Sequence, residues 1–229
     1  TLEQYQKFLQ VNSEDELFLA QKCVEIFCNV PLIIVSKMSY KDVKNYAARI
    51  MSFFEDKPQL RKIHTMGDVE YGFIPNLEEK SLGEYVDIDE SINDWEKMHT
   101  TMAVLYRPIK SRRKDKYNIE EYEGTSDTEH RMKGLTMDVV LGALFFFLSF
   151  RDRVVDSFDS LFNGTGGEHD LSSGANFGRK WGWYTTFYHL SQGDVTRFEK
   201  ISKLRLFAAL TMMTYDKEKN ELEKSLLKI

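Results

Sequence analysis

Residues 134–163 read GLTMDVVLGALFFFLSFRDRVVDSFDSLFN and form the longest apolar stretch of the chain. Apolar side chains recur along it at the three- and four-residue spacing of an α-helix, so one face stays apolar throughout. These side chains are Met137, Val140, Leu141, Leu144, Phe147, Leu148, Val155, Phe158 and Phe162. The opposite face turns polar after Phe150, and we expect the first half to be buried on all sides. The stretch predicts a central helix on which the other elements pack.

The uncharged part of this stretch is too short to cross a membrane. It runs from Val139 to Phe150 and is followed at once by Arg151, Asp152 and Arg153. A spanning helix needs about 20 apolar residues. We therefore expect a core helix and no membrane-bound form of the protein.

Composition and charge favour a globular protein without a nucleic-acid partner. The chain has 229 residues, of which 42% are hydrophobic, enough to fill a core. Its 36 acidic and 31 basic side chains are well mixed and leave a net charge of -5. Because no basic field dominates, binding to nucleic acid is not expected.

The two cysteines indicate a reducing compartment. Cys23 and Cys28 lie five residues apart on a predicted helix, a spacing that fits neither a C-x-x-C redox motif nor half of a zinc site. Free cysteines are commonly buried. We expect two buried, reduced thiols in a cytosolic protein.

Hydrophobic spacing predicts a mainly α-helical fold with one small β-hairpin. Helices are predicted at residues 2–10, at 14–28 with a capping box from Ser13 to Glu16, and after a cap at Ser39. These helices would form an N-terminal helical subunit at residues 1–57. The main helical body would follow at 58–229, with the β-hairpin at 61–74 turning at Gly67 and Asp68.

Three further segments of the main body have distinct patterns. Residues 81–107 carry helical spacing that ends at Arg107 and Pro108. The basic run KSRRKDK at 110–116 is predicted to be a solvated loop. The glycine- and serine-rich stretch at 164–178 is predicted to be a flexible loop.

No residue pattern predicts an active site, a metal or a cofactor. Five histidines are scattered without zinc-hydrolase spacing, and no serine lies in a G-x-S-x-G motif. The acidic group Asp87, Asp89, Glu90, Asp94 and Glu96 lacks the glycine and closing glutamate of a calcium loop. We interpret it as a solvated helix face. The alternative is a nuclease or nucleotide-binding enzyme that uses this acidic group and the glycine-rich stretch, with a divalent metal at Asp87, Asp89 and Asp94.

An aromatic group near the C-terminal part is the candidate binding site. Trp181, Tyr184 and Tyr188 fall on one helical face, and Trp183 and Phe187 fall on another. A single buried stripe cannot hide all five side chains. Exposed aromatic clusters are typical of interfaces, so we predict that this group binds a protein partner, with plain core packing as the alternative.

Four segments together resemble a family of known proteins. They are YGFIPNLEEKSLGEYVDIDE at 71–90, MAVLYRP at 102–108, MDVVLGALFFF at 137–147 and GWYTTFYHLSQGDVTRFEKISKL at 182–204. In these segments the chain is similar to tail-assembly-chaperone-like proteins of tailed bacteriophages, particularly phages of gut Bacteroidales. The resemblance covers about residues 70–225, and its motifs are structural.

The resemblance implies a non-enzymatic, mostly helical protein of phage tail morphogenesis. Its partners would be the tape-measure or tail-tube proteins, whose premature aggregation it would prevent in the cytoplasm of the host cell. The alternative is a structural component of the virion, such as a neck, ring, head–tail connector or packaged protein. Both readings are compatible with a homo-oligomer, and neither involves a cofactor.

Overall fold

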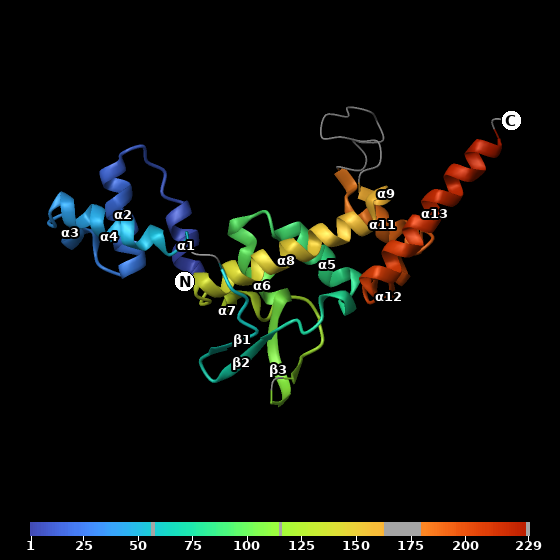
Figure 1. Ribbon diagram of the computed structural model, residues 1–229, viewed down its shortest axis with the longest axis horizontal. Helices are drawn as coiled ribbons and strands as arrows, with labels where there is room; N and C mark the ends of the chain where they lie inside the picture. Colours follow the sequence, from blue (N-terminus) through green and yellow to red (C-terminus); the bar gives the residue numbers. More distant parts are fainter. Residues whose placement is uncertain (56–57, 115, 163–179, 228–229) are drawn as a thin grey trace. The chain divides into compact units, whose positions relative to one another are not determined.

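The computed structural model describes residues 1–55, 58–114, 116–162 and 180–227 (Figure 1). It is mainly α-helical with a small antiparallel sheet, which confirms the predicted fold class. The chain forms two compact units, each built from two segments. Unit 1 contains Thr1–Phe73 and Ser91–Phe146, and unit 2 contains Ile74–Glu90 and Phe147–Ile229. The predicted domain boundary at residue 57 lies inside unit 1.

Unit 1 begins with the helices α1 (Leu2–Leu9), α2 (Glu16–Cys28), α3 (Leu32–Val35) and α4 (Tyr40–Ser52). Val24, Val35 and Val43 form a small buried cluster among α2, α3 and α4. The cap predicted at Ser39 is confirmed, because its hydroxyl accepts a hydrogen bond from the Asp42 amide at 3.2 Å. The other predicted cap is wrong. Asp15, and not Ser13, caps α2.

The cysteine prediction holds for one of the two thiols. Cys23 is buried, whereas Cys28 is exposed at the end of α2. Burial raises the pKa of the Cys23 thiol to about 11. Cys23 is therefore held protonated, and the expectation of two buried thiols is wrong for Cys28.

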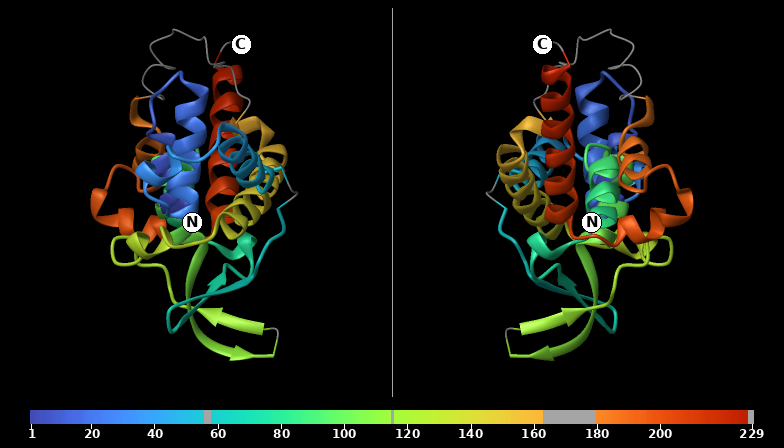
Figure 2. Two further views of the ribbon diagram at one scale, coloured as in Figure 1. Left: turned by 90° about the vertical axis from the view of Figure 1, so that its left-hand side faces the viewer. Right: turned by 90° about the vertical axis from the view of Figure 1, so that its right-hand side faces the viewer.

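The predicted hairpin is part of a larger sheet in unit 1. Its strands β1 (Ile63–Met66) and β2 (Val69–Phe73) confirm the prediction for residues 61–74. The strands β3 (Tyr106–Arg113) and β4 (Lys116–Ile119) extend the sheet in the order β1-β2-β3-β4 (Figure 2). Every neighbouring pair is antiparallel.

Tight packing joins the two hairpins of the sheet. Phe73 of β2 pairs with Tyr106 of β3, and their rings meet edge to face at 5.4 Å. The Tyr117 hydroxyl of β4 donates a hydrogen bond to the Phe73 carbonyl at 2.7 Å. A Cβ at Gly72 would overlap the Tyr117 ring, so glycine is needed where β4 packs over β2. The basic run at 110–116 therefore lies in a hairpin, and its prediction as a loop is wrong.

The helix predicted for residues 81–107 is interrupted. Its residues form α5 (Leu82–Ser91), a 3₁₀ turn η2 (Trp95–Lys97) and α6 (Met98–Leu105), before β3 begins at Tyr106. Almost all of α6 is buried, including Met98, Met102 and Leu105. The prediction of one helix is wrong because the apolar spacing continues across residues 91–95, where the chain turns.

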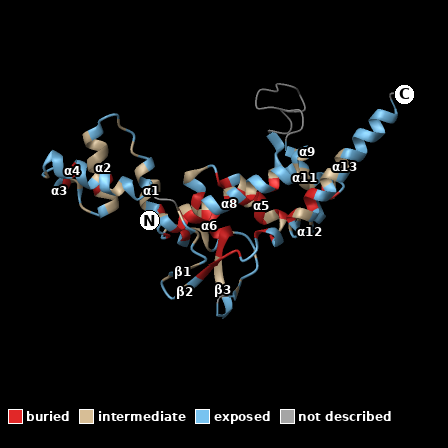
Figure 3. Ribbon diagram, in the orientation of Figure 1, coloured by how far each residue is buried: buried red, intermediate tan, exposed pale blue. Residues whose placement is uncertain are grey.

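The predicted central helix is present but shorter. Following the short α7 (Glu129–Met132), α8 (Met137–Ser157) ends before Phe158, and α9 (Asp159–Phe162) follows. The first half is not buried on all sides, because Phe145 and Phe146 are 62% and 42% exposed. The core residues lie on one face of α8 (Figure 3). None of the helices in the described part of the chain is long and apolar enough to span a membrane.

Unit 2 contains the second half of α8, α9 and most of α5. Its other elements are η1 (Leu77–Glu79), α11 (Trp183–Leu190), η3 (Val195–Arg197), α12 (Phe198–Ser202) and α13 (Leu206–Leu226). Its buried core includes Leu82, Tyr85, Phe147, Phe150, Val154, Leu190, Leu206 and Leu210. The glycine-rich stretch at 164–178, predicted to be flexible, lies outside the described residues.

Candidate protein-binding surface

The structure divides the five predicted aromatic residues into two sets. Trp181, Tyr184 and Tyr188 are 42%, 47% and 53% exposed. Trp183 and Phe187 are half-buried. For the four residues of α11 this is the division into two faces that helical spacing predicts, whereas Trp181 precedes α11 and is separated from it by Gly182, whose backbone is not helical (φ 44°). We call Trp181, Tyr184 and Tyr188 the aromatic face.

Trp183 turns inward and attaches α11 to α5 within unit 2. Its indole nitrogen Nε1 donates a hydrogen bond to Asp89 Oδ2 at 3.0 Å. Its ring meets the ring of Tyr85 edge to face, with centroids 5.7 Å apart. A buried indole requires such a partner for its N–H group. The side chain therefore holds α11 in place and is not available to a partner protein.

Phe198 of α12 supports α11 from its other side. Its ring lies 5.8 Å from Phe187 and 5.5 Å from Tyr184. The chain reverses between these helices at Gly193, which has φ +80° and donates its amide to the Tyr188 carbonyl at 2.8 Å. A glycine suits this left-handed conformation. The turn places α12 directly beneath the aromatic face.

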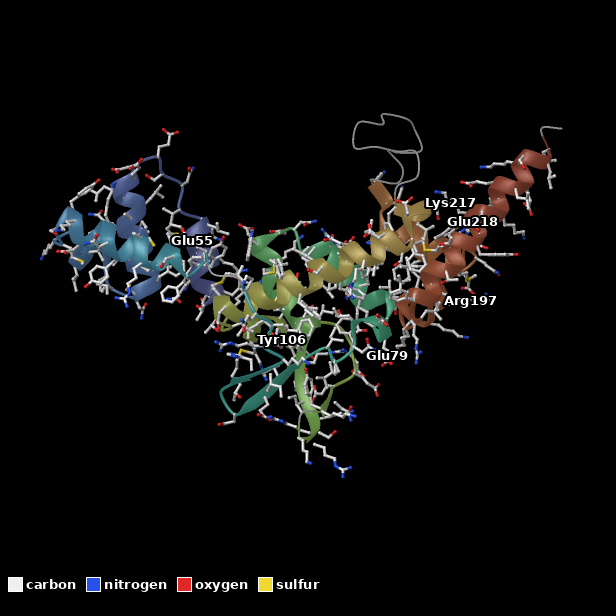
Figure 4. All side chains as sticks on the ribbon, in the orientation of Figure 1. Glu55, Glu79, Tyr106, Arg197, Lys217 and Glu218 are labelled. Carbon is white, nitrogen blue, oxygen red and sulfur yellow. The ribbon has the colours of Figure 1, made fainter. Side chains whose placement is uncertain are left out.

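The turn after Gly193 is stabilised by a local cap. Asp194 Oδ1 accepts hydrogen bonds from the Thr196 hydroxyl at 2.6 Å and from the Thr196 amide at 3.0 Å. These bonds, helped by Arg197, lower the pKa of Asp194. Arg197 lies in η3 and pairs with Asp194 at 3.1 Å (Figure 4). The aromatic face thus rests on a short segment with fixed geometry.

The aromatic face is amphipathic. The rings of Trp181 and Tyr184 lie 5.5 Å apart, and the Lys180 amine lies 5.2 Å from the Trp181 ring. Nearby in the sequence, Val195 is 58% exposed. Tryptophan and tyrosine combine a large apolar area with a polar group, and they are enriched among the residues that dominate binding energy. This surface is suited to a protein partner.

A shallow groove of about 420 Å³ lies among α9, α11 and α13, and a histidine lines it. His189 Nε2 and Asp216 Oδ2 are 3.1 Å apart, and both side chains contact solvent. A histidine of this kind acts in catalysis when it activates a nucleophile. Within the described residues, no serine, threonine or cysteine is hydrogen-bonded to the His189 ring. We interpret the pair as a surface interaction.

The acidic residues of the metal hypothesis have separate structural roles. Asp89 accepts the hydrogen bond from Trp183 in unit 2, while Asp94 caps η2 in unit 1 by accepting from the Glu96 amide at 2.9 Å. Among the residues that the structure describes, no three His, Cys, Asp or Glu side chains are grouped so that they could hold a metal ion. The glycine-rich stretch of the same hypothesis lies outside these residues.

The basic run contributes to the sheet of unit 1. Arg112 Nη1 lies 3.1 Å from Glu70 Oε1, which joins β3 to β2 at the surface. Both side chains are nearly half exposed, and exposed ion pairs contribute about 0–1 kcal/mol. The run therefore has a structural partner in the neighbouring strand.

The core of unit 2 contains a lysine that hydrophobic spacing does not predict. Lys80 is only 3% exposed and lies in the core of unit 2. Its position next to the capping motif Ser81-x-x-Glu84 was the available signal, because the residue before such a motif commonly packs on the helix. Lysines are almost never fully buried without a partner, which is why composition alone does not predict this one.

Three comparisons, with protein-family models, with curated proteins and with solved structures, found no match to this chain. The fold and the surface define a mainly helical protein with a small sheet and an exposed aromatic face.

Proposed function

We propose that this protein is a non-enzymatic binding protein that engages its partner through the aromatic face. The observation that carries this proposal is the difference between inward and exposed aromatic side chains in α11 and just before it. Trp183 and Phe187 hold the helix against unit 2, whereas Trp181, Tyr184 and Tyr188 remain exposed at 42–53%. Three large aromatic side chains on one supported face provide the anchor residues that protein interfaces use.

The proposed process is tail assembly of a bacteriophage. The resemblance of residues 70–225 to tail-assembly-chaperone-like proteins supports it, and the segment 182–204 of that resemblance contains most of α11, η3 and α12. The partner would be a tape-measure or tail-tube protein whose apolar surface the aromatic face covers before assembly. The protein would act in the host cytoplasm. A permanent component of the virion is the alternative.

A binding experiment tests the surface. Purified tape-measure and tail-tube proteins from the phage that encodes this chain would be titrated with the wild type and with a Trp181→Ser, Tyr184→Ser, Tyr188→Ser variant. We expect the triple variant to bind at least about tenfold more weakly, since anchor residues each contribute more than about 1 kcal/mol. Its helix content, measured by circular dichroism, should be unchanged.

The matched control removes exposed aromatic rings from unit 1. Tyr40 and Tyr46 lie on α4 and are 56% and 49% exposed. A Tyr40→Ser, Tyr46→Ser variant should bind like the wild type. Equal weakening by both variants would reject the aromatic face as the site, and absence of binding to either phage protein would reject the proposed partners.

Quantitative mass spectrometry separates the chaperone from the virion component. The chain would be measured in infected cells and in purified virions. A transient assembly factor is abundant in the lysate and absent from particles. A fixed copy number in the particles would overturn the chaperone proposal and favour the structural component.

A further inference from the structure

Lys80 occupies a position in unit 2 that normally belongs to an apolar residue. Ser81 and Glu84 form a capping box at the start of α5: the Ser81 amide donates to Glu84 Oε2 at 2.7 Å, and the Glu84 amide donates to Ser81 Oγ at 3.2 Å. The residue before such a cap is often apolar and packs on the fourth residue of the helix. Here that pair is Lys80 and Tyr85.

Three aromatic rings surround the amine of Lys80. Its Nζ atom lies 4.7 Å from the centroid of Tyr85, and 4.2 Å from the centroids of both Phe147 and Phe150. Within the described part of the chain, this nitrogen has no hydrogen-bond partner. The N–H groups of an ammonium ion need hydrogen-bond acceptors or water around them. A neutral amine tolerates apolar surroundings much better. The ring faces attract a cation at these distances, whereas burial without a hydrogen-bond partner among the described residues favours the uncharged amine.

The charged groups around the cage do not pair with the amine. On α5, Glu84 and Asp89 attract a proton to Lys80, but Glu84 accepts from Ser81 and Asp89 accepts from Trp183 of α11. Positive groups come from α8, where the Arg153 guanidinium lies 5.9 Å from the Phe150 ring and Arg151 acts on Tyr85. Burial outweighs the two carboxylates and lowers the pKa of Lys80 to about 6.

The backbone at Lys80 is also attached to the start of α13. The Leu206 amide donates to the Lys80 carbonyl at 2.9 Å, and the Leu82 amide donates to the Leu204 carbonyl at 2.8 Å. Between these two bonds, Ser81 and Arg205 form an antiparallel bridge. The side chain of Lys80 thus packs on α8 while its main chain holds the beginning of α13.

We propose that Lys80 is a pH-sensitive latch, in which an uncharged amine caged by Tyr85, Phe147 and Phe150 fastens the start of α13. Release of this attachment is coupled to the uptake of one proton at Nζ, because the freed amine returns to water and becomes an ordinary lysine.

The direction of the pH dependence is set by the number of protons that the closed and open forms bind. The open form binds one more proton than the closed form between pH about 6 and about 10, so opening becomes tenfold more favourable for each unit by which the pH falls. The effect levels off below pH about 6. The latch is independent of the proposed partner.

Direct titration of the amine is the first test. Nuclear magnetic resonance of protein with ¹³C- and ¹⁵N-labelled lysine would follow the side-chain signals from pH 5 to 11, with Lys80 assigned by its loss in Lys80→Met. We expect the Lys80 amine to be neutral at pH 7, far below the ordinary lysine pKa of about 10. A Lys80 signal that titrates near 10 would overturn the proposal. If Lys80→Met does not fold, Lys80→Gln provides the assignment, and the wild-type curve alone shows whether any lysine is neutral at pH 7.

Hydrogen exchange then tests the latch itself. The amides of Leu82 and Leu206 report the two bonds to α13, and the Phe73 amide, which donates to the Lys62 carbonyl in unit 1, is the control. After correction for intrinsic rates, protection of Leu82 and Leu206 should fall about a hundredfold from pH 8.5 to 6.5. Protection of Phe73 should not fall in parallel. Lys80→Met should abolish the dependence.

Two results would reject the latch. The first is constant protection of Leu82 and Leu206 across this range, which would show that proton uptake does not accompany opening. The second is the same fall in Lys80→Met as in the wild type, which would assign the dependence to another group. In both cases the aromatic face and its proposed role would be unaffected.

Discussion

Tyr106 in unit 1 and Lys80 in unit 2 are buried polar side chains with different surroundings. In unit 1, Tyr106 is fully buried and its hydroxyl donates to the Arg61 carbonyl at 2.6 Å (Figure 4). The buried hydroxyls of Ser91 and Thr101 in the same unit pair with each other at 2.7 Å. In unit 2, the equally buried amine of Lys80 is surrounded by rings and, among the described residues, has no hydrogen-bond partner.

The paired hydroxyls of unit 1 stabilise the fold, whereas the amine of Lys80 opposes folding. A buried polar group contributes to stability when its partner is already in place, and it destabilises the fold when the partner is missing. Local conflicts of the second kind are expected at sites with a role beyond stability. Tyr106 and Lys80 therefore predict mutational effects of opposite sign.

The largest expected effect comes from the ring beneath Lys80. Phe147 is fully buried, and Phe147→Ala should destabilise unit 2 by about 3–5 kcal/mol through the lost apolar contact and the cavity. A variant that keeps Trp95 as its single tryptophan would report the urea unfolding of unit 1. A variant that keeps only Trp183 would report the urea unfolding of unit 2. Phe147→Ala should lower the midpoint seen by Trp183, and Phe73→Ala should lower the midpoint seen by Trp95. Equal shifts at both reporters would contradict the division into two units.

Removing the amine should stabilise unit 2. Because the pKa of Lys80 falls to about 6 on folding, Lys80→Met should raise the free energy of unfolding at pH 7 by roughly 4 kcal/mol. The stability gained by Lys80→Met should shrink between pH 7 and 9. Over this range the wild type becomes more stable, because the Lys80 amine of the unfolded chain loses its proton more readily as the pH rises. Urea titrations of the Trp183 reporter at several pH values measure this. A destabilised Lys80→Met variant would show that the cage favours the charged form.

Removing the hydroxyl of Tyr106 should destabilise the protein, the opposite of the effect expected for Lys80→Met. Tyr106→Phe leaves the Arg61 carbonyl without its donor and should destabilise unit 1 by about 1–2 kcal/mol, measured with the Trp95 reporter. Burial raises the pKa of Tyr106, so this contribution is lost only as the pH rises above the ordinary tyrosine pKa of about 10. A neutral Tyr106→Phe substitution at pH 7 would remove the contrast with Lys80.

The smallest effects distinguish the inward indole of Trp183 from the exposed indole of Trp181. Trp183→Phe loses the hydrogen bond to Asp89 and should destabilise unit 2 by about 1 kcal/mol. Trp181→Phe changes an exposed side chain and should alter stability by less than about 0.5 kcal/mol. Thermal unfolding followed by circular dichroism compares the two variants. Equal losses would mean that both indoles belong to the core.

Local patterns in the sequence predicted the parts of the fold that depend on near neighbours. The cap at Ser39 and the hairpin at β1 and β2 were predicted because their hydrogen bonds join residues close in the chain. The second hairpin was missed because β3 depends on pairing with β2, more than thirty positions earlier, and its basic side chains hide the strand pattern. The break between α5 and α6 was missed for a related reason, since apolar spacing continues across it.

For the candidate surface, the sequence by itself determined that Tyr184 and Tyr188 fall on a different face of α11 from Trp183 and Phe187, because helical geometry follows from spacing alone. Only the tertiary structure decided which face is exposed, since that depends on where Asp89 and Phe198 lie. The same holds for Lys80. Its capping motif is local, but its burial under α8 and its attachment to α13 arise from contacts between segments that are distant in the chain.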